Sequence, residues 1–181
     1  MIENTLSQFE LFLESDYKLV EKELKYRKLF KDDILLREGE ICKSLYYIQS
    51  GSFIQYQTKE IEKHIIDLHI KNEWFVNHSS FIAQKPSSTA IMAFEETEIL
   101  ELSVNSIHKL IETSPVFLSL GKILDQARER TLFFDKCFSP TDKYNYILKN
   151  RPQLIQKFPL KIISSYLKIA PETLSRVRSA H

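Results

Sequence analysis

Residues 34–57, ILLREGEICKSLYYIQSGSFIQYQ, decide the fold. They contain three short runs rich in Ile, Leu, Tyr and Phe, separated by Glu, Lys, Ser and Gly. Such runs, bounded by turn residues, are typical of β-strands. Gly39 and Gly51 stand where strands would reverse, so we predict a positive φ at both positions. The three predicted strands are Ile34–Arg37, Leu45–Gln49 and Phe53–Gln57.

The same pattern extends on both sides of this stretch. Four further runs are predicted as strands, at Arg27–Phe30, His64–His69, Thr89–Ala93 and Ile99–Ser103. Several short strands at near-regular spacing predict a β-sandwich or jelly roll. Residues 74–83 are ambiguous, and a single helical turn within the barrel is one interpretation.

Helical patterns flank the predicted strands. Ile2–Leu24 has apolar residues at helical spacing, with Ser15 as an N-cap candidate between its two halves. Asn105–Glu112 is predicted to be a short helix. Ser114 and Pro115 then supply an N-cap and a first-turn proline for a longer helix that runs to about Phe134.

This longer helix carries two apolar seams, which indicates two neighbours. We predict that one neighbour is the barrel and the other is a second subunit; a helix buried within one subunit is the alternative. The second seam contains Val116 and Ile123. The seam predicted for the dimer contains Phe117, Leu120, Leu124, Ala127 and Phe134.

Charge is balanced over the whole chain but not along it. The 181 residues carry a formal net charge of +1, whereas residues 141–181 contain eight basic and two acidic side chains, a net of +6. The remainder therefore carries −5. A basic C-terminal segment on an acidic body favours a polyanionic partner for that segment. A solvated basic face is the alternative.

The basic segment has the pattern of two short helices joined by a tight turn. Leu160–Leu167 is predicted to be the first helix, and Lys168-Ile169-Ala170 the connection. Pro171 suits the first position of the second helix, with Leu174 and Val177 facing inward. The second helix then presents a polar and basic face, the arrangement of a DNA-binding helix-turn-helix.

Two motifs together resemble the CRP/FNR-type transcription regulators of bacteria. Residues 163–176, ISSYLKIAPETLSR, resemble the helix-turn-helix of that family. Glu38-Gly39-Glu40 followed by residues 45–51, LYYIQSG, is similar to a signature of its cyclic-nucleotide-binding jelly roll. The motifs stand in the family's order. The resemblance implies an α+β fold: an N-terminal jelly roll, a long dimerisation helix and a C-terminal helix-turn-helix.

The resemblance also implies which residues contact DNA. Glu172 and Arg176 match base-contacting positions of the family, whereas Pro171 replaces an arginine. In the connection, Lys168 stands where glycine is frequent and Ala170 where a capping Ser or Thr is frequent. The full set of expected DNA contacts is Pro171, Glu172, Thr173, Ser175, Arg176, Arg178, Lys161 and Lys168.

The expected effector pocket departs from the family pattern. Members that bind cyclic nucleotides have a Phe-Gly-Glu turn followed ten residues later by Arg, which neutralises the phosphate. Here the turn is Phe75-Val76-Asn77, and Ser87, followed by Ser88, occupies the arginine position. Because a buried phosphate without a cation is strongly unfavourable, we predict no cyclic-nucleotide binding. An unidentified small-molecule effector and a purely dimerising barrel both stay open.

Other classes of site find little support. Three glycines exclude the usual phosphate-cradling loops, and Cys42 and Cys137 cannot form a four-thiolate site. Free thiols and the absence of a long apolar segment favour a cytoplasmic protein that does not bind membranes. We expect no metal, no cofactor and no enzymatic activity. The candidates for a cupin-like metal site, which the sequence disfavours, are His64, His69, Glu73 and His78.

The sequence therefore predicts three parts. Residues 1–112 form a sensor-like jelly roll with N-terminal helices, 113–138 a dimerisation helix and 139–181 a DNA-binding helix-turn-helix domain. The predicted function is a homodimeric, sequence-specific transcription regulator that binds an inverted-repeat DNA operator. The alternative is an orphan small-molecule sensor or interaction domain whose C-terminal module does not bind DNA.

Overall fold

The computed structural model describes residue 6 and residues 12–133 and 139–179. Two four-stranded antiparallel sheets pack face to face, which confirms the predicted β-sandwich. One sheet has the order β1-β8-β3-β6 and the other β2-β7-β4-β5. The strands are β1 (Lys25–Leu29), β2 (Ile34–Leu36), β3 (Ser44–Ser50), β4 (Ser52–Lys59), β5 (Glu62–Ile70), β6 (Trp74–Phe75), β7 (Ala90–Ala93) and β8 (Thr97–Ser103).

All seven predicted strands are present with small changes at their ends. The ambiguous stretch resolves into strand β6 and the short helix α3 (His78–Ala83). Gly39 and Gly51 both have a φ of 86°, as predicted. At Gly51 any larger residue is also excluded sterically, because a Cβ atom there would overlap the side chain of Thr97 and the carbonyl of Glu96.

The core between the two sheets is built from residues that alternate along each strand. Phe53, Phe75, Ile91, Ile99 and Leu102 are completely buried in it. The opposite face of β4, β5 and β7 is also covered, so that the first five residues of β4 are all buried. A strand buried on both sides shows no polar-apolar alternation.

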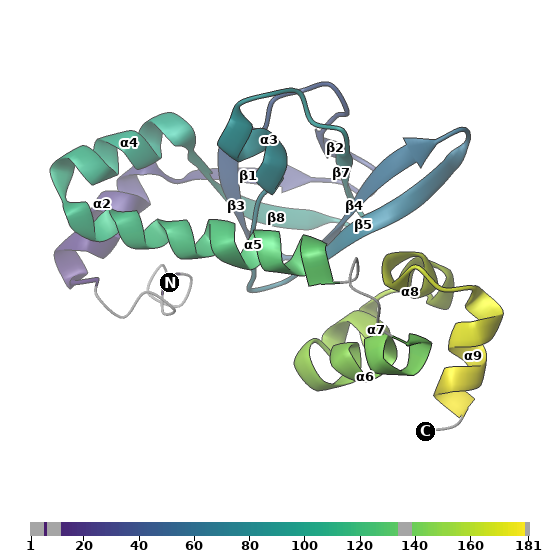
Figure 1. The fold of residues 1–181 in the computed structure, drawn as a ribbon. Helices are drawn as coiled ribbons and strands as arrows, with labels where there is room; N and C mark the ends of the chain where they lie inside the picture. The colour runs from purple at the N-terminus through teal and green to yellow at the C-terminus, as the bar shows by residue number, and fades with distance from the viewer. Residues whose placement is uncertain (1–5, 7–11, 134–138, 180–181) are drawn as a thin grey trace.

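Helices surround the sandwich on both sides (Figure 1). At the end where the described chain begins lie α2 (Glu14–Glu23) and α4 (Val104–Thr113). The N-cap of α2 is Leu13 and not Ser15, because the Asp16 carboxylate accepts the Leu13 N–H at 2.8 Å. The first part of the predicted Ile2–Leu24 helix lies mostly outside the described residues.

The helix predicted from Ser114 forms in two pieces. Ser114 is the N-cap, as predicted, of the 3₁₀ helix η1 (Pro115–Leu120), which continues into α5 (Gly121–Phe133). Phe117, Leu120 and Ala127 are buried within the chain, and the Phe117 ring packs against Phe12 at a centroid distance of 5.3 Å.

The predicted dimer seam is therefore corrected. Three of its residues, Phe117, Leu120 and Ala127, pack into the protomer's own core together with Ile123, and Leu124 is half-buried against the same core. Phe134, the fifth, lies outside the described residues. The outward side of η1 and α5 is mostly polar, although Leu118 is 63% exposed. The apolar spacing correctly marked an inner face but did not tell which neighbour covers it.

The C-terminal module contains four helices that pack on the outer face of the β2-β7-β4-β5 sheet (Figure 1). Ile54, Ile65 and Leu68 of the sheet share one buried cluster with Ile163 and Leu167 of the module. This packing is the second cover that buries β4 and β5 on both sides. The helices are α6 (Pro140–Asn150), α7 (Gln153–Lys157), α8 (Leu160–Leu167) and α9 (Pro171–Ser179).

Candidate functional site

Helices α8 and α9 are joined by three residues; α8 has the predicted bounds, and α9 begins at Pro171 as predicted and ends at Ser179. Leu174 is buried and Val177 is half-buried, so the inner face of α9 is the predicted one. Thr173 is half-buried. The remaining residues expected on this surface are exposed: Lys161, Lys168, Pro171, Glu172, Ser175, Arg176 and Arg178.

The turn between the two helices takes its shape from backbone hydrogen bonds. Lys168 has a φ of 55°, the left-handed conformation that the comparison with glycine predicts at this position. The Lys168 N–H donates to the Ser165 carbonyl at 3.1 Å, and the Ile169 N–H to the Ser164 carbonyl at 3.0 Å. These bonds satisfy the C-terminal carbonyls of α8 and offset a strain of about 1–2 kcal/mol at a residue with a side chain.

Lys143, Arg151 and Lys157, three basic residues of the C-terminal segment, bind groups outside the proposed DNA-contacting surface. Lys143 is buried and its Nζ donates to the Leu167 carbonyl at 3.0 Å, at the end of α8. Arg151 is paired with Glu73, and Lys157 lies 2.5 Å from a Glu95 carboxylate oxygen. The basic surface is therefore smaller than the sequence predicts, and it is concentrated on α8, α9 and the turn between them.

The residues expected in the effector pocket come together, but they bind one another. Asn77 Nδ2 donates to Ser87 Oγ and to Thr89 Oγ1, each at 2.7 Å. Asn77 Oδ1 accepts the Ser80 N–H at 3.2 Å and caps helix α3. Phe75, Val76, Asn77 and Ser87 are all buried. The positions that would bind a ribose hydroxyl and a phosphate are thus hydrogen-bonded to each other, while Ser88 is exposed.

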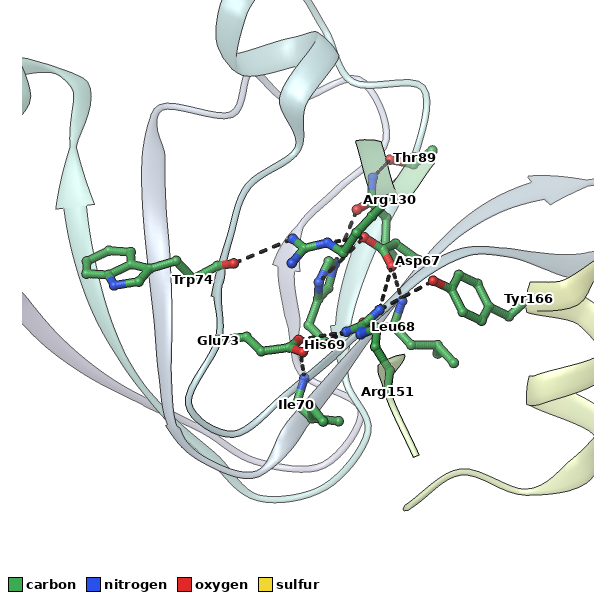
Figure 2. A network of polar contacts seen from close by, with 11 residues as sticks. Asp67, Leu68, His69, Ile70, Glu73, Trp74, Thr89, Arg130, Arg151 and Tyr166 are labelled. Atoms are coloured by element: carbon green, nitrogen blue, oxygen red, sulfur yellow. Dashed lines mark hydrogen bonds and ion pairs between the residues drawn. The ribbon is translucent and has the colours of Figure 1, made fainter. Parts of the chain in front are cut away.

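A second buried polar network joins the sandwich to the C-terminal module (Figure 2). The Arg151 Nη2 lies 2.9 and 2.7 Å from the two Glu73 carboxylate oxygens and donates to the Leu68 carbonyl at 2.8 Å. Its Nη1 lies 3.6 Å from Asp67 Oδ1 and donates to the Tyr166 hydroxyl at 3.3 Å. One guanidinium therefore connects strand β5, the β5–β6 turn and helix α8.

Arg130, near the end of α5, reaches the same carboxylate from the other side. Its Nε lies 3.3 Å from Asp67 Oδ2, and its Nη2 donates to the Trp74 carbonyl at 3.5 Å. His69 stacks on Phe75 at a centroid distance of 4.4 Å, with its Nδ1 3.8 Å from Asp67 Oδ2. Asp67 thus lies between two arginines and a histidine.

The charge states in this network follow from burial and from these neighbours. Burial by itself would raise the pKa of Asp67, but the charges of Arg130 and Arg151 and the hydrogen bond from the Leu68 N–H outweigh it, and the pKa lies below its usual value. Burial lowers the pKa of His69 to about 3, so the imidazole is neutral near pH 7. Burial raises the pKa of Tyr166, which keeps its hydroxyl protonated. The two negative charges of Asp67 and Glu73 then balance the two positive charges of Arg130 and Arg151.

This network is not apparent from the sequence. The sequence suggests Glu73 and His69 only as candidate metal ligands, and it singles out none of Asp67, Arg130, Arg151 and Tyr166. One signal is present: Asp67 interrupts the apolar strand sequence IIDLHI, and a buried carboxylate requires a partner. Its arginine partners come from segments more than 60 residues away, so no spacing rule could identify them.

Two further classes of site find no support in the described part of the chain. No group of three or more His, Cys, Asp or Glu side chains there is arranged to hold a metal ion. Within the same residues, no helix combines the length and the apolar character that crossing a bilayer requires.

Comparison with known proteins places this geometry in context. Residues 26–114 match the family model of the cyclic nucleotide-binding domain. No curated protein matches the chain. Among solved structures, FixK2 from Bradyrhizobium japonicum has a TM-score of 0.66 at 16% sequence identity. The aligned region covers 87% of this chain and 83% of the FixK2 chain.

Two other solved structures share the fold. The Thermus thermophilus Catabolite Activator Protein has a TM-score of 0.59 at 21% identity, covering 95% of this chain and 84% of its own. The sensor domain of the transcriptional regulator DNR from Pseudomonas aeruginosa has a TM-score of 0.58 at 18% identity, covering 75% of this chain and 93% of its own. The chain therefore has the fold of these proteins, and its residues 26–114 match the cyclic nucleotide-binding domain.

Proposed function

We propose that the protein is a sequence-specific, DNA-binding transcription regulator of the CRP/FNR type that does not respond to cyclic nucleotides. The observation that carries the proposal is the exposed polar and basic face of α9. This helix follows α8 after a three-residue turn, and its buried Leu174 fixes the opposite face against the module. The fold shared with the Catabolite Activator Protein extends over 95% of this chain, so it includes most of residues 139–181. We assign the protein no catalytic role.

The side chains on α9 suit base recognition. An arginine donates two hydrogen bonds to guanine O6 and N7, and a glutamate accepts from the cytosine amino group. Arg176 and Glu172 are exposed and lie one helical turn apart on the same face. Lys161, at the start of α8, and Lys168, in the turn, suit phosphate contacts, which position a protein without reading sequence.

A homodimer would present two such helices to DNA. The operator is then expected to be an inverted repeat with half-sites about 34–36 Å apart. Because Phe117, Leu120 and Ala127 face the protomer's own core, the dimer surface we propose is the outward side of η1 and α5, where Leu118 is exposed.

Arg176→Ala is expected to weaken binding to the selected operator by about 1–3 kcal/mol per half-site and to relax the preference at one base position. The measurement is fluorescence anisotropy with the selected operator and with scrambled DNA over a salt series. The matched control is Arg27→Ala, which removes the same charge from the exposed strand β1. If Arg176→Ala weakens both DNAs equally, Arg176 contacts phosphate only.

Selection of operators from a random DNA pool tests the function itself. A preferred inverted repeat supports the regulator. Absence of any sequence preference in the wild-type protein would overturn this proposal in favour of the orphan sensor or interaction domain.

We further predict that neither cyclic AMP nor cyclic GMP binds saturably at physiological concentrations. Asn77 and Ser87 provide no charge for the phosphate, and their hydrogen-bonding groups already bind each other at 2.7 Å. A ligand would have to break these buried bonds, and each buried polar group left unsatisfied costs about 1–3 kcal/mol. Isothermal titration calorimetry checks this directly, and micromolar affinity for either nucleotide would contradict it.

A further inference from the structure

The β4–β5 hairpin projects beyond the sandwich on the side that carries α8 (Figure 1). Its base is attached to α8, because the Ile65 N–H donates to Ser165 Oγ at 3.0 Å. Its strands pair up to Lys59 and Glu62, and Ile61 at the tip is 95% exposed. The hairpin is therefore a paired arm with an exposed end, fixed to the first of the two helices proposed to dock on DNA.

Two grooves lie between this hairpin and the proposed DNA-contacting residues. One, of about 460 Å³, is lined by Lys63 and His64 of the hairpin and by Lys161 and Pro171 of the module. The other, of about 590 Å³, is lined by Lys59 and His64 and by Lys168 and Ala170. Three residues proposed to contact DNA thus share a groove with a lysine of the hairpin.

The charges around these grooves favour an anion. Lys59, Lys63, Lys161 and Lys168 are all exposed, and the acidic residues of the hairpin end are Glu60 and Glu62. Glu38 adds a third carboxylate, since it accepts the Thr58 N–H at 2.8 Å. Four ammonium groups against three carboxylates leave a net positive charge at the site. Lys63 is also held in place, because its Nζ lies 4.6 Å from the centre of the Tyr56 ring and 3.5 Å from Met92 Sδ.

The way in which a helix-turn-helix docks on DNA indicates that the anion in these two grooves is the DNA backbone. The start of the second helix enters the major groove, while the first helix crosses the sugar-phosphate backbone. A backbone that passes Lys161 and Pro171 also passes Lys63 of the hairpin, because these residues line the same groove. Lysines line both grooves, so a backbone on this path passes cations from the hairpin and from the module.

We propose that the β4–β5 hairpin is a second DNA-contacting element, in which Lys59 and Lys63 bind backbone phosphates that flank the bases read by α9. This inference rests on the proposed function and adds a contact from the sandwich itself. Phosphate contacts are independent of sequence, so the hairpin contributes affinity and salt dependence but no base preference.

The test measures binding of the full chain to its selected operator and to scrambled DNA over a salt series. Lys63→Gln and Lys59→Gln are each expected to weaken both DNAs equally and to reduce the salt slope by about 0.9 for each phosphate that the variant no longer neutralises. Glu62→Gln is expected to strengthen both. Lys18→Gln on α2 is the matched control, since it removes one exposed charge at the opposite end of the molecule.

One further variant, Lys63→Arg, and the Lys59→Gln variant separate DNA binding from folding. Lys63→Arg keeps the charge and is expected to restore the salt slope. Lys59→Gln removes a side chain that, unlike Lys63, lies over no aromatic ring in the described part of the chain.

The outcomes distinguish this inference from the proposed function. If the wild type binds its operator selectively while Lys59→Gln and Lys63→Gln keep the wild-type salt slope, the hairpin does not contact DNA. The proposed function as a transcription regulator is then unaffected. Tighter binding by Lys63→Gln would also overturn the hairpin contact. If the wild type selects no sequence, both proposals fail.

Discussion

Arg151→Met is expected to lower the free energy of unfolding by about 3–5 kcal/mol, because it removes one of the two guanidinium groups beside the buried Asp67 and the partner of the half-buried Glu73. The Arg151 side chain is 12% exposed and is paired with Glu73 and Asp67. Methionine keeps an unbranched apolar stem and lacks the guanidinium group, so the loss includes the charge, the hydrogen bonds and the space that this group fills. Urea denaturation followed by circular dichroism measures it.

The matched control for this substitution is Arg178→Met, at an exposed position of α9, which is expected to change stability by less than about 0.5 kcal/mol. The double variant Arg151→Met/Glu73→Gln is expected to lose less than the sum of the two single variants, because each removes the other's partner. A loss below about 1 kcal/mol for Arg151→Met would mean that the network does not hold the module to the sandwich.

Leu120→Glu is expected to prevent folding of the protomer itself. Leu120 is 2% exposed, and removing such a side chain typically costs about 2–5 kcal/mol before the burial of a carboxylate is added. Leu118→Glu, two residues earlier, is the matched control because Leu118 is 63% exposed. This variant is expected to keep the fold. Circular dichroism and thermal unfolding of both variants check this.

The same pair of variants tests the dimer surface. If the outward side of η1 and α5 meets a second subunit, Leu118→Glu converts a dimer into a folded monomer in sedimentation. A folded Leu120→Glu monomer would instead return Leu120 to a subunit interface and contradict the burial described above. A dimer that persists in Leu118→Glu would place the interface elsewhere on the protein.

Local chemistry explains what could be predicted from the sequence. The strands are predictable because their side chains are β-branched or aromatic and because Gly, Ser, Asp and Glu interrupt them. The positive φ at Gly39, Gly51 and Lys168 follows from turn geometry and from the family pattern. The bounds of α8 and the start of α9 follow from the spacing of apolar residues and from Pro171.

The residues of the expected effector pocket were also predictable, but only as a departure from the family pattern. The sequence shows that Asn77 and Ser87 replace a carboxylate and a guanidinium. That these two side chains bind each other, together with Thr89, depends on the packing of α3 against the sheets. The sequence indicated that a ligand's charged partners are absent, and the structure shows what occupies their place.

What the sequence alone determined was therefore seven of the eight strands and most of the helices, their order and the inner and outer faces of α9, because each depends on residues a few positions apart. It did not predict β6, α6 or α7. The tertiary structure decided which surfaces those faces meet. It placed Phe117 and Leu120 in the protomer's own core, covered the second face of β4 and β5 with the C-terminal module, and joined Asp67, Arg130 and Arg151. An apolar seam or a lone charge specifies that it must be covered or paired, but its partner can come from any segment that the chain folds beside it.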